Sequence, residues 1–295
     1  MYTEHQGSGV FAIDKPSGFT SFDVVAKLRG ILGIRKIGHG GTLDPMATGV
    51  LPVFLNKATR VIELISDNSK RYTAKARFGI KTDTGDITGK VINENDLYPS
   101  EKRLSSALLS FLGQGVQLPP MYSAVKINGK RLYDIARSGK SVERSPREIQ
   151  IYSMALLEYI EKNREFTIDV CCSKGVYIRS LVEDIAESMG MVSTLTALRR
   201  TKSGPFIESD CVTFEDIQTQ AASKCFSFIK PVDILFSGLA GITLSPEQFN
   251  AFINGVRVFD DAFPKEGAFK VYYGNKLIAL STSSEGYLKS KVRFV

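Results

Sequence analysis

Histidine and paired cysteine are scarce in this sequence, and their scarcity argues against a metal site. The 295 residues include only two histidines, His5 and His39, and no C-x-x-C pair. Metal sites usually draw on several imidazole or thiolate ligands at characteristic spacings. The sequence therefore predicts no metal site.

The four cysteines, Cys171, Cys172, Cys211 and Cys225, also lack the spacing of a disulfide framework, which is typical of a reduced protein of the cytoplasm. The vicinal pair Cys171 and Cys172 falls in an alternating pattern and is expected to supply small core or face residues. The first nine residues lack the basic and apolar parts of a signal peptide, and no apolar run approaches the length of a membrane span. We therefore expect a cytoplasmic protein without a membrane partner.

Acidic residues are the minority among the charged ones, at 31 against 38 basic residues. The net charge of +7 favours a polyanionic partner, nucleic acid being the usual one, although a merely basic soluble protein would show the same balance. Hydrophobic residues, at 43%, suffice for a substantial core.

The most distinctive stretch is the glycine-rich segment 36–52, K-I-G-H-G-G-T-L-D-P-M-A-T-G-V-L-P, which carries one carboxylate, Asp44, and one imidazole, His39. Its glycines allow left-handed turns or a close approach to a ligand, and Pro45 keeps Asp44 out of helical geometry. The spacing of a dinucleotide-binding loop and the Gly-Lys-Ser/Thr of a Walker loop are both absent. The segment either presents these side chains for chemistry or forms a glycine-rich surface turn, and composition alone leaves both open.

Periodicity predicts a mixture of helices and strands. Apolar residues at helical spacing, beginning with Phe22, predict a helix capped by Thr20 or Ser21 that ends near Gly33. Strict alternation over 71–78 predicts a half-exposed antiparallel strand with a basic outer face.

Two later segments carry charged residues of interest. Residues 82–89, T-D-T-G-D-I-T-G, are similar to a calcium loop only superficially, and we expect a hairpin-like connection there. Tyr177 and Arg179 follow a predicted strand; in extended geometry they would share a face, where Arg179 could pair with a carboxylate or be purely structural. Residues 198–206 are expected to form a basic turn.

Between residues 126 and 147 basic side chains outnumber acidic ones by seven to two, with Tyr122 and Tyr133 nearby. This pattern favours a flexible arm that grips a phosphate backbone, although a solvated loop would also be basic. The basic residues of the arm are Lys126, Lys130, Arg131, Arg137, Lys140, Arg144 and Arg147.

Beyond composition, the segment 38–52 strongly resembles the catalytic motif of the bacterial tRNA pseudouridine synthase B family. Further segments are similar in the same order along the chain: D-K-P-S-G-F-T-S (14–21), K-R-Y-T-A-K-A-R-F-G (70–79), P-P-M-Y-S-A-V-K-I-N-G-K-R-L-Y (119–133), C-S-K-G-V-Y-I-R-S-L (172–181) and L-R-R (198–200). The resemblance covers roughly residues 10 to 210, and the C-terminal part is only loosely similar to the family's PUA-like RNA-binding domain.

The resemblance implies an enzyme, an isomerase that converts uridine 55 in the TΨC loop of tRNA to pseudouridine by base flipping, without a cofactor or metal. Asp44 then matches the catalytic aspartate, Tyr72 the tyrosine that stacks on the flipped base, and Arg179 the partner of the aspartate. The remaining site residues are Tyr177 and Leu198 of the pocket, Lys15 and Pro16 behind the tyrosine, and His39, which enters the RNA loop.

The resemblance also implies the architecture: an α/β (α+β) pseudouridine synthase fold with a large mixed or antiparallel sheet and flanking helices. We expect a catalytic domain over 1–236, including the basic arm at about 120–148, and a small β-rich PUA-like domain over 240–295. A monomer without an obligate protein partner is expected. Two alternatives share the scaffold: a guide-RNA-dependent synthase, and a non-catalytic tRNA chaperone or RNA-binding protein.

Overall fold

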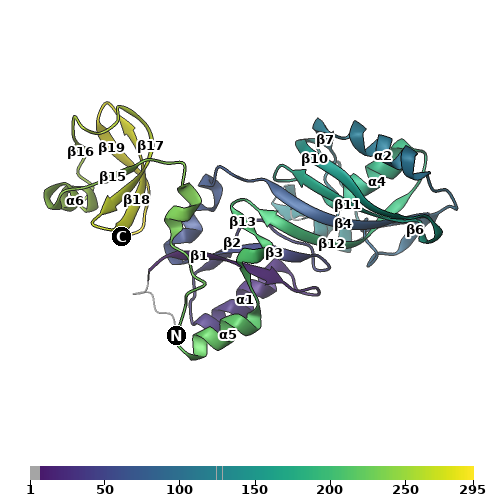
Figure 1. Cartoon of the computed structure of the whole chain (residues 1–295), viewed down its shortest axis with the longest axis horizontal. Coiled ribbons are helices and arrows are strands. Elements are labelled where there is room, and N and C mark those ends of the chain that lie inside the picture. Colours follow the sequence, from purple (N-terminus) through teal and green to yellow (C-terminus); the bar gives the residue numbers. More distant parts are fainter. Residues whose placement is uncertain (1–6, 124, 128) are drawn as a thin grey trace.

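The computed structural model of the chain describes residues 7–123, 125–127 and 129–295; within these ranges the side chains of Lys126, Lys130, Arg131 and Arg137 are not described. Two separate sheets lie along the long axis of the molecule (Figure 1). The larger one has ten strands and the smaller one, close to the C-terminus, has five. This arrangement confirms the predicted large mixed sheet with a small β-rich module after it.

The large sheet is mixed, with the main order β14-β1-β3-β12-β4-β11-β10-β7. The pairs β1–β14 and β3–β12 are parallel, and the other neighbours along this path are antiparallel. Strand β2 pairs with β3 and β13 pairs with β12. The strands are β1 (Gly9–Lys15), β2 (Ile37–His39), β3 (Thr48–Leu55), β4 (Lys70–Phe78), β7 (Gly113–Gln117), β10 (Arg147–Ile160), β11 (Glu165–Cys172), β12 (Ser193–Ser203), β13 (Phe206–Ile207) and β14 (Cys211–Val212).

Strand β4 runs through the middle of this sheet and shows the alternation predicted from the sequence. Tyr72, Ala74, Ala76 and Phe78 are buried on one face, because a strand sends alternate side chains to opposite sides. On the other face Arg71 and Lys75 pair with acidic residues of β11. The prediction of an antiparallel strand with a basic outer face is confirmed.

One face of the sheet includes the Tyr72 side chain of β4. Four helices pack over this face and bury the main hydrophobic core. The opposite face carries a second core under the 3-10 helices η2 and η5. The helices are α1 (Ser21–Leu32), α2 (Glu101–Ser110), α4 (Ile178–Ser188) and α5 (Phe214–Ala222), with η2 (Asn56–Leu64), η3 (Glu161–Asn163), η4 (Glu208–Asp210) and η5 (Val232–Phe236).

Helix α1 begins and ends where the sequence predicted. Thr20 forms a capping box with Asp23, and Gly33 ends the helix in the left-handed conformation. Phe22, the first residue of the apolar spacing, lies in the helix but is 66% exposed. Ser21 takes the buried position instead, because its hydroxyl accepts a hydrogen bond from the Leu43 backbone N–H at 2.9 Å.

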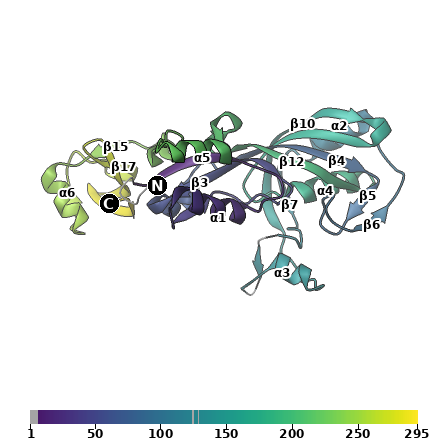
Figure 2. The same cartoon turned by 90° about the horizontal axis from the view of Figure 1, so that it is seen from below.

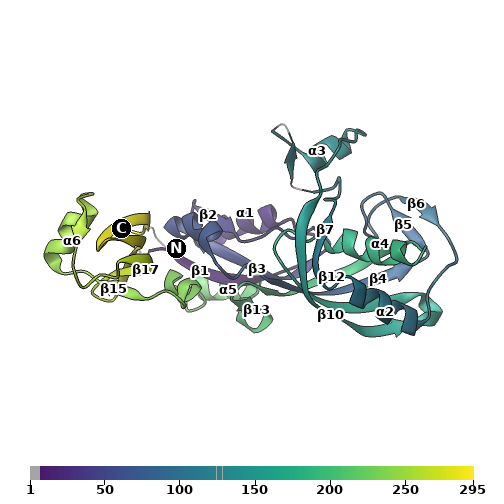
Figure 3. The same ribbon diagram turned by 90° about the horizontal axis from the view of Figure 1, so that it is seen from above.

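Two small hairpins extend from the main sheet. β5 (Ile80–Thr82) pairs with β6 (Val91–Glu94), which confirms a hairpin-like connection around 82–89. β8 (Lys126–Ile127) and β9 (Lys130–Arg131) precede α3 (Leu132–Arg137). Figures 2 and 3 show that α3 and its hairpin stand out from the rest of the molecule, in the region expected to be an arm.

The five-stranded sheet has the order β15-β17-β18-β19-β16 and a hydrophobic core of its own. Leu280 of this sheet also belongs to the second core of the main body, so the module packs against the larger part of the chain. In the described residues no helix is long and apolar enough to cross a membrane. The elements are β15 (Gly241–Thr243), α6 (Pro246–Ile253), β16 (Val258–Phe259), β17 (Glu266–Tyr273), β18 (Lys276–Ser284) and β19 (Tyr287–Arg293).

Candidate active site

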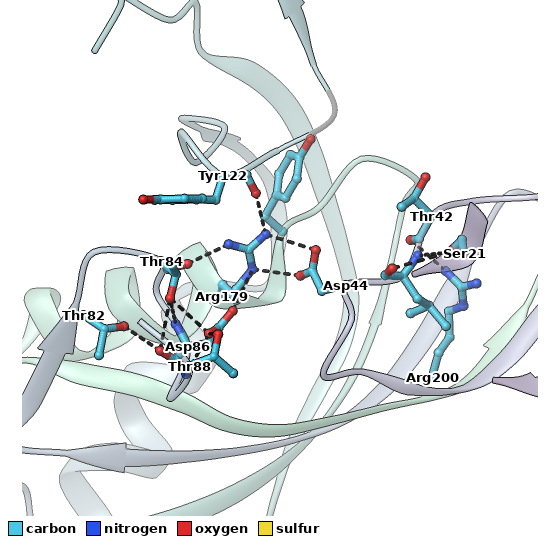
Figure 4. Close-up of polar contacts among 12 residues, drawn as sticks. Ser21, Thr42, Asp44, Thr82, Thr84, Asp86, Thr88, Tyr122, Arg179 and Arg200 are labelled. Carbon is cyan, nitrogen blue, oxygen red and sulfur yellow. Dashed lines mark hydrogen bonds and ion pairs between the residues drawn. The ribbon is translucent and has the colours of Figure 1, made fainter. Parts of the chain in front are cut away.

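The centre of the candidate site is an ion pair between Asp44 and Arg179 (Figure 4). Arg179 Nε donates to Asp44 Oδ2 at 2.8 Å and Arg179 Nη2 donates to Asp44 Oδ1 at 3.1 Å. Two parallel bonds of this kind fix the orientation of both groups as well as attracting them. The Arg179 side chain is only 4% exposed, whereas that of Asp44 is 34% exposed. A carboxylate held from behind is therefore presented to solvent.

Arg179 occupies the first turn of α4, and Tyr177 is the N-cap residue of that helix. The expectation that the two side chains share a face of an extended segment is therefore wrong. The backbone of Tyr177 is instead held by both polar atoms of the Gln117 amide, at 2.8 and 3.1 Å. Arg179 nonetheless has the acidic partner that the sequence left open.

The guanidinium of Arg179 also binds the backbone on two sides. Its Nη1 donates to the Thr84 carbonyl at 2.6 Å and its Nη2 to the Tyr122 carbonyl at 2.8 Å (Figure 4). Tyr122 lies at the start of the arm, so the Arg179 side chain joins the Asp44 loop, the β5–β6 connection and the arm.

Asp86 is a member of this cluster that sequence reasoning missed. Its Oδ2 lies 3.9 Å from Arg179 Nε, and its side chain is 8% exposed. Its Oδ1 accepts hydrogen bonds from the Thr84 hydroxyl and from the backbone and hydroxyl of Thr88. The signal was the run of Asp and Thr in 82–89, where carboxylate and hydroxyl groups at short spacing favour such local bonds.

Two buried cations hold the backbone of the Asp44 loop. Lys15 is fully buried, and its ammonium donates to the carbonyls of Pro16, Phe19 and Pro45 at 2.9, 2.6 and 3.2 Å. Burial lowers the pKa of Lys15 to about 8, while the Asp44 carboxylate acts in the opposite direction. Pro16, next to it, is half-buried.

Arg200 is the second of these cations and was also missed. It is 1% exposed and donates to the carbonyls of Val50, Gly41 and Thr42 at 2.7, 3.0 and 3.4 Å. The sequence suggested a basic turn over 198–206, but residues up to Ser203 belong to strand β12. Arg200 and Arg199 point to opposite sides of that strand, and Arg199 forms partly exposed ion pairs with Asp14 and Glu208.

Tyr72 and Leu198 lie on the neighbouring strands β4 and β12, and both are 7% exposed. Burial raises the pKa of the Tyr72 hydroxyl, while the Arg200 guanidinium lowers it. Both side chains belong to the main core. In this structure they are therefore buried and do not form an open surface on which a base could stack.

His39 lies in β2, five residues before Asp44. Its Nδ1 is buried and has no hydrogen-bond partner among the described residues. Burial is the main cause that lowers the pKa of His39, with a contribution from Arg200. At neutral pH the ring is expected to be uncharged.

The predicted arm residues lie apart from this cluster. Lys140 and Arg147 are exposed, and Arg144 donates to the Pro119 carbonyl at 2.8 Å. The side chains of Lys126, Lys130, Arg131 and Arg137 fall outside the described part. Over the ranges that the structure describes, no group of three or more His, Cys, Asp or Glu side chains is placed to hold a metal ion.

Comparison with known proteins agrees with this geometry. Residues 29–178 match the family model described as "TruB family pseudouridylate synthase (N terminal domain)", and residues 179–237 match "tRNA pseudouridylate synthase B C-terminal domain". A protein named tRNA pseudouridine synthase B from Clostridium perfringens (strain SM101 / Type A) is 42% identical over 274 residues, which are 91% of this chain and 92% of the relative. One of the same name from Streptococcus gordonii is 37% identical over 98% of this chain and 100% of the relative.

Among solved structures, a chain of a Cbf5-Nop10-Gar1 complex superposes with a TM-score of 0.71 at 26% identity, covering 97% of this chain and 85% of that one. The two family matches together contain Asp44, Tyr72 and Arg179. The predicted fold class is thereby confirmed. The chain belongs to the TruB family of pseudouridylate synthases.

Proposed function

We propose that this protein converts a uridine of tRNA to pseudouridine, and that the target is uridine 55 of the TΨC loop. The observation that carries the proposal is the partly exposed Asp44 carboxylate, bound through both oxygens by the buried Arg179. The family match and the relatives named tRNA pseudouridine synthase B support the reaction and the substrate class.

The reaction is an isomerisation that consumes no co-substrate. The bond between N1 of the base and C1′ of the ribose breaks, the base turns, and a bond from C5 to C1′ forms; C5 loses its proton and N1 gains one. In our proposal Asp44 is the group that acts on the uridine, and Arg179 holds it in one orientation. Preorganisation of this kind reduces the rearrangement needed when the reaction begins.

The uridine must leave its stack to reach Asp44. Flipping a nucleotide costs a few kcal/mol, and stacking on an aromatic ring returns about 1–3 kcal/mol. Tyr72 is the proposed stacking partner, but only 7% of its surface is exposed. Contact with a base therefore requires that neighbouring groups move, and the segment at Tyr122, which binds Arg179 through its carbonyl, is the proposed moving part.

Binding of the rest of the RNA is assigned to basic surface segments. We propose that the arm grips the phosphate backbone through residues that include the exposed Lys140 and Arg147. The five-stranded module is proposed to act as a PUA-like RNA-binding domain. The protein is proposed to act as a monomer without an obligate partner, in the cytoplasm, where the tRNA substrate is found.

The test is pseudouridine mapping on an unmodified tRNA transcript incubated with the purified protein alone, next to Asp44→Asn. The substitution preserves size and removes the charge, so we expect one product site in the TΨC loop for the wild type and none for the variant, with RNA binding retained. Wild-type-like turnover by Asp44→Asn would overturn the assignment.

One specific observation keeps a guide-RNA-dependent activity as the second candidate: the TM-score of 0.71 to a chain from a Cbf5 complex. If the wild type binds tRNA but makes no product, addition of cellular RNA and protein distinguishes the candidates. Product restored by the addition favours a guided synthase. Binding that never leads to product favours an RNA chaperone.

A further inference from the structure

A cavity of about 220 Å³ borders the glycine loop at Gly40 and Gly41, and neither Asp44 nor Arg179 lines it. One wall is apolar and is formed largely by Phe54, Ile62 and Phe206. Two lysines, Lys70 and Lys174, also line the cavity. The side chains of Phe54, Ile62, Phe206, Lys70 and Lys174 were not assigned to the ion-pair cluster of the candidate active site.

The two lysines that line the cavity bring positive charge that is not fully paired. Lys70 is half-buried and donates to the Ser203 hydroxyl at 2.7 Å, but among the described residues it has no carboxylate within ion-pair distance. An ammonium group has three donors, so this one has capacity for another acceptor. Burial is the main cause that lowers the pKa of Lys70 to about 8; Arg200 and Lys174 act in the same direction, and Asp67 acts against them.

The two carboxylates that line the cavity, Asp67 and Glu63, do not form ion pairs with Lys70 or Lys174 among the described residues. Asp67 lies 3.3 Å from Lys202 and accepts hydrogen bonds from Ser69, so its charge already has partners. Glu63 is exposed in η2. A cavity that combines an unpaired half-buried cation with an apolar wall favours an amphipathic anion rather than a free metal or a neutral molecule.

The Lys70 ammonium lies close to the Asp44 loop at Gly41. A Cβ atom built on Gly41 would lie 3.7 Å from Lys70 Nζ and 3.6 Å from Arg200 Nη1. The backbone at Gly41 is left-handed, with φ at +91°. Asp44 follows only three residues later, so a ligand bound at Lys70 contacts the same short loop that presents the catalytic carboxylate.

We propose that this cavity binds one backbone phosphate of the RNA substrate, at a nucleotide close to the target uridine, with Lys70 and Lys174 as its ligands. The apolar wall then covers the ribose or base attached to that phosphate. This inference rests on the proposed function, because it takes RNA as the substrate. It assigns to Lys70 a positioning role: it fixes the strand on one side of the Gly40–Gly41 turn while the uridine enters on the other.

The experiment measures the affinity of a TΨC stem-loop for Asp44→Asn and for the same protein carrying Lys70→Met, over a range of salt concentrations. Methionine keeps the length of the side chain and removes the charge. One lost phosphate contact predicts that the slope of log K against log salt falls by about 0.7–0.9. Lys174→Met, at an exposed position, tests the same site without risk to folding, and we expect a change in the same direction.

Neutral methylphosphonate linkages, placed one at a time on either side of the target uridine, locate the phosphate. At one linkage we expect the replacement to weaken binding to Asp44→Asn several-fold, to weaken binding to Asp44→Asn/Lys70→Met less, and to leave binding unchanged when Lys70→Met and Lys174→Met are combined with Asp44→Asn. The matched control is Lys75→Met, which lies on the opposite face of β4 and pairs with Glu165, and should behave as the parent protein.

Three results would each overturn the proposal. Every linkage could have the same effect on Asp44→Asn and on Asp44→Asn/Lys70→Met, the salt slope could be unchanged by Lys70→Met, or RNA binding could be unmeasurable. Product formation by the wild type on the same unmodified stem-loop is measured in parallel. If pseudouridine forms but no linkage effect depends on Lys70, the phosphate site alone is refuted. If a linkage effect depends on Lys70 but no pseudouridine forms, the proposed reaction is refuted and the phosphate site remains supported.

Discussion

Asp44 and Arg179 are 135 residues apart in the sequence and are joined by two hydrogen bonds, of 2.8 and 3.1 Å. The same guanidinium binds the carbonyls of Thr84 and Tyr122. Four bonds from one rigid, planar group fix the carboxylate relative to two other segments of the chain. A single ammonium cannot reproduce that pattern.

We therefore expect Arg179→Lys to lower the single-turnover rate at saturating RNA by at least about tenfold, since orientation of Asp44, the proposed catalytic group, is worth that much or more. Overall RNA affinity should change little. The control is Arg71→Lys, which alters an exposed pair with Asp169. Equal rates for Arg179→Lys and the wild type would show that the bidentate pair has no part in the chemical step.

Asp86→Asn is expected to act through Arg179. The substitution removes a charge 3.9 Å from Arg179 Nε and disturbs a carboxylate that accepts hydrogen bonds from Thr84 and Thr88. A loss of about 1–3 kcal/mol of stability is expected from the buried bonds, together with a slower turnover. Asp83→Asn, in the same hairpin connection, provides the comparison, because Asp83 accepts a hydrogen bond from the Lys90 backbone at an exposed site.

Arg200→Lys tests whether the buried guanidinium holds the catalytic loop. Three carbonyls that now accept from Arg200 would lose partners, and we expect about 2–4 kcal/mol less unfolding free energy in urea. Arg199→Lys, the adjacent residue on the other face of β12, should cost less, about 1 kcal/mol, because its ion pairs are partly exposed and the lysine ammonium can still pair with Asp14 or Glu208. Similar losses for the two variants would contradict the role given to Arg200.

The buried lysines predict a dependence of stability on pH. Lys15 and Lys70 have a pKa of about 8 in the folded protein, against an ordinary value of 10.5. Just above pH 8 the unfolded chain therefore binds more protons than the folded one, and the unfolding free energy should rise with pH. Above about pH 9 the raised pKa values of Cys172 and Cys211 act in the opposite direction.

Chemical denaturation between pH 7 and 9 measures this rise directly. In Lys70→Met one of the two titrating lysines is gone, so the rise should be smaller, whereas Lys75→Met should retain it. A flat curve for the wild type over this range would mean that neither ammonium loses a proton in the folded state near pH 8.

Local sequence pattern was sufficient for much of the fold. The alternation of β4 and the caps of α1 depend on neighbouring residues, and both are as predicted. The exposure of Phe22 could not be read from helical spacing, because the face of α1 that is buried depends on tertiary contacts such as that of Ser21 with the distant Leu43.

The site itself was only partly accessible from the sequence. The glycine loop marked Asp44, but the partner of Arg179 depends on tertiary contacts that spacing does not encode. Arg200 was missed because a fully buried arginine is unusual, and its partners are carbonyls, which carry no sequence signature. Asp86 was visible in a short run of Asp and Thr, but its link to Arg179 required the folded arrangement.

The order of strands in the large sheet has a consequence for how the enzyme is made. Strand β12 lies between β3 and β4, and it is synthesised after both. A growing chain that ends before Ser193 already contains Asp44, Tyr72 and Arg179, but it lacks the strand that joins the two parts of the sheet carrying them. Pairing between such distant segments is slow compared with local folding. We therefore expect the proposed Asp44–Arg179 site to form only after β12 has emerged from the ribosome.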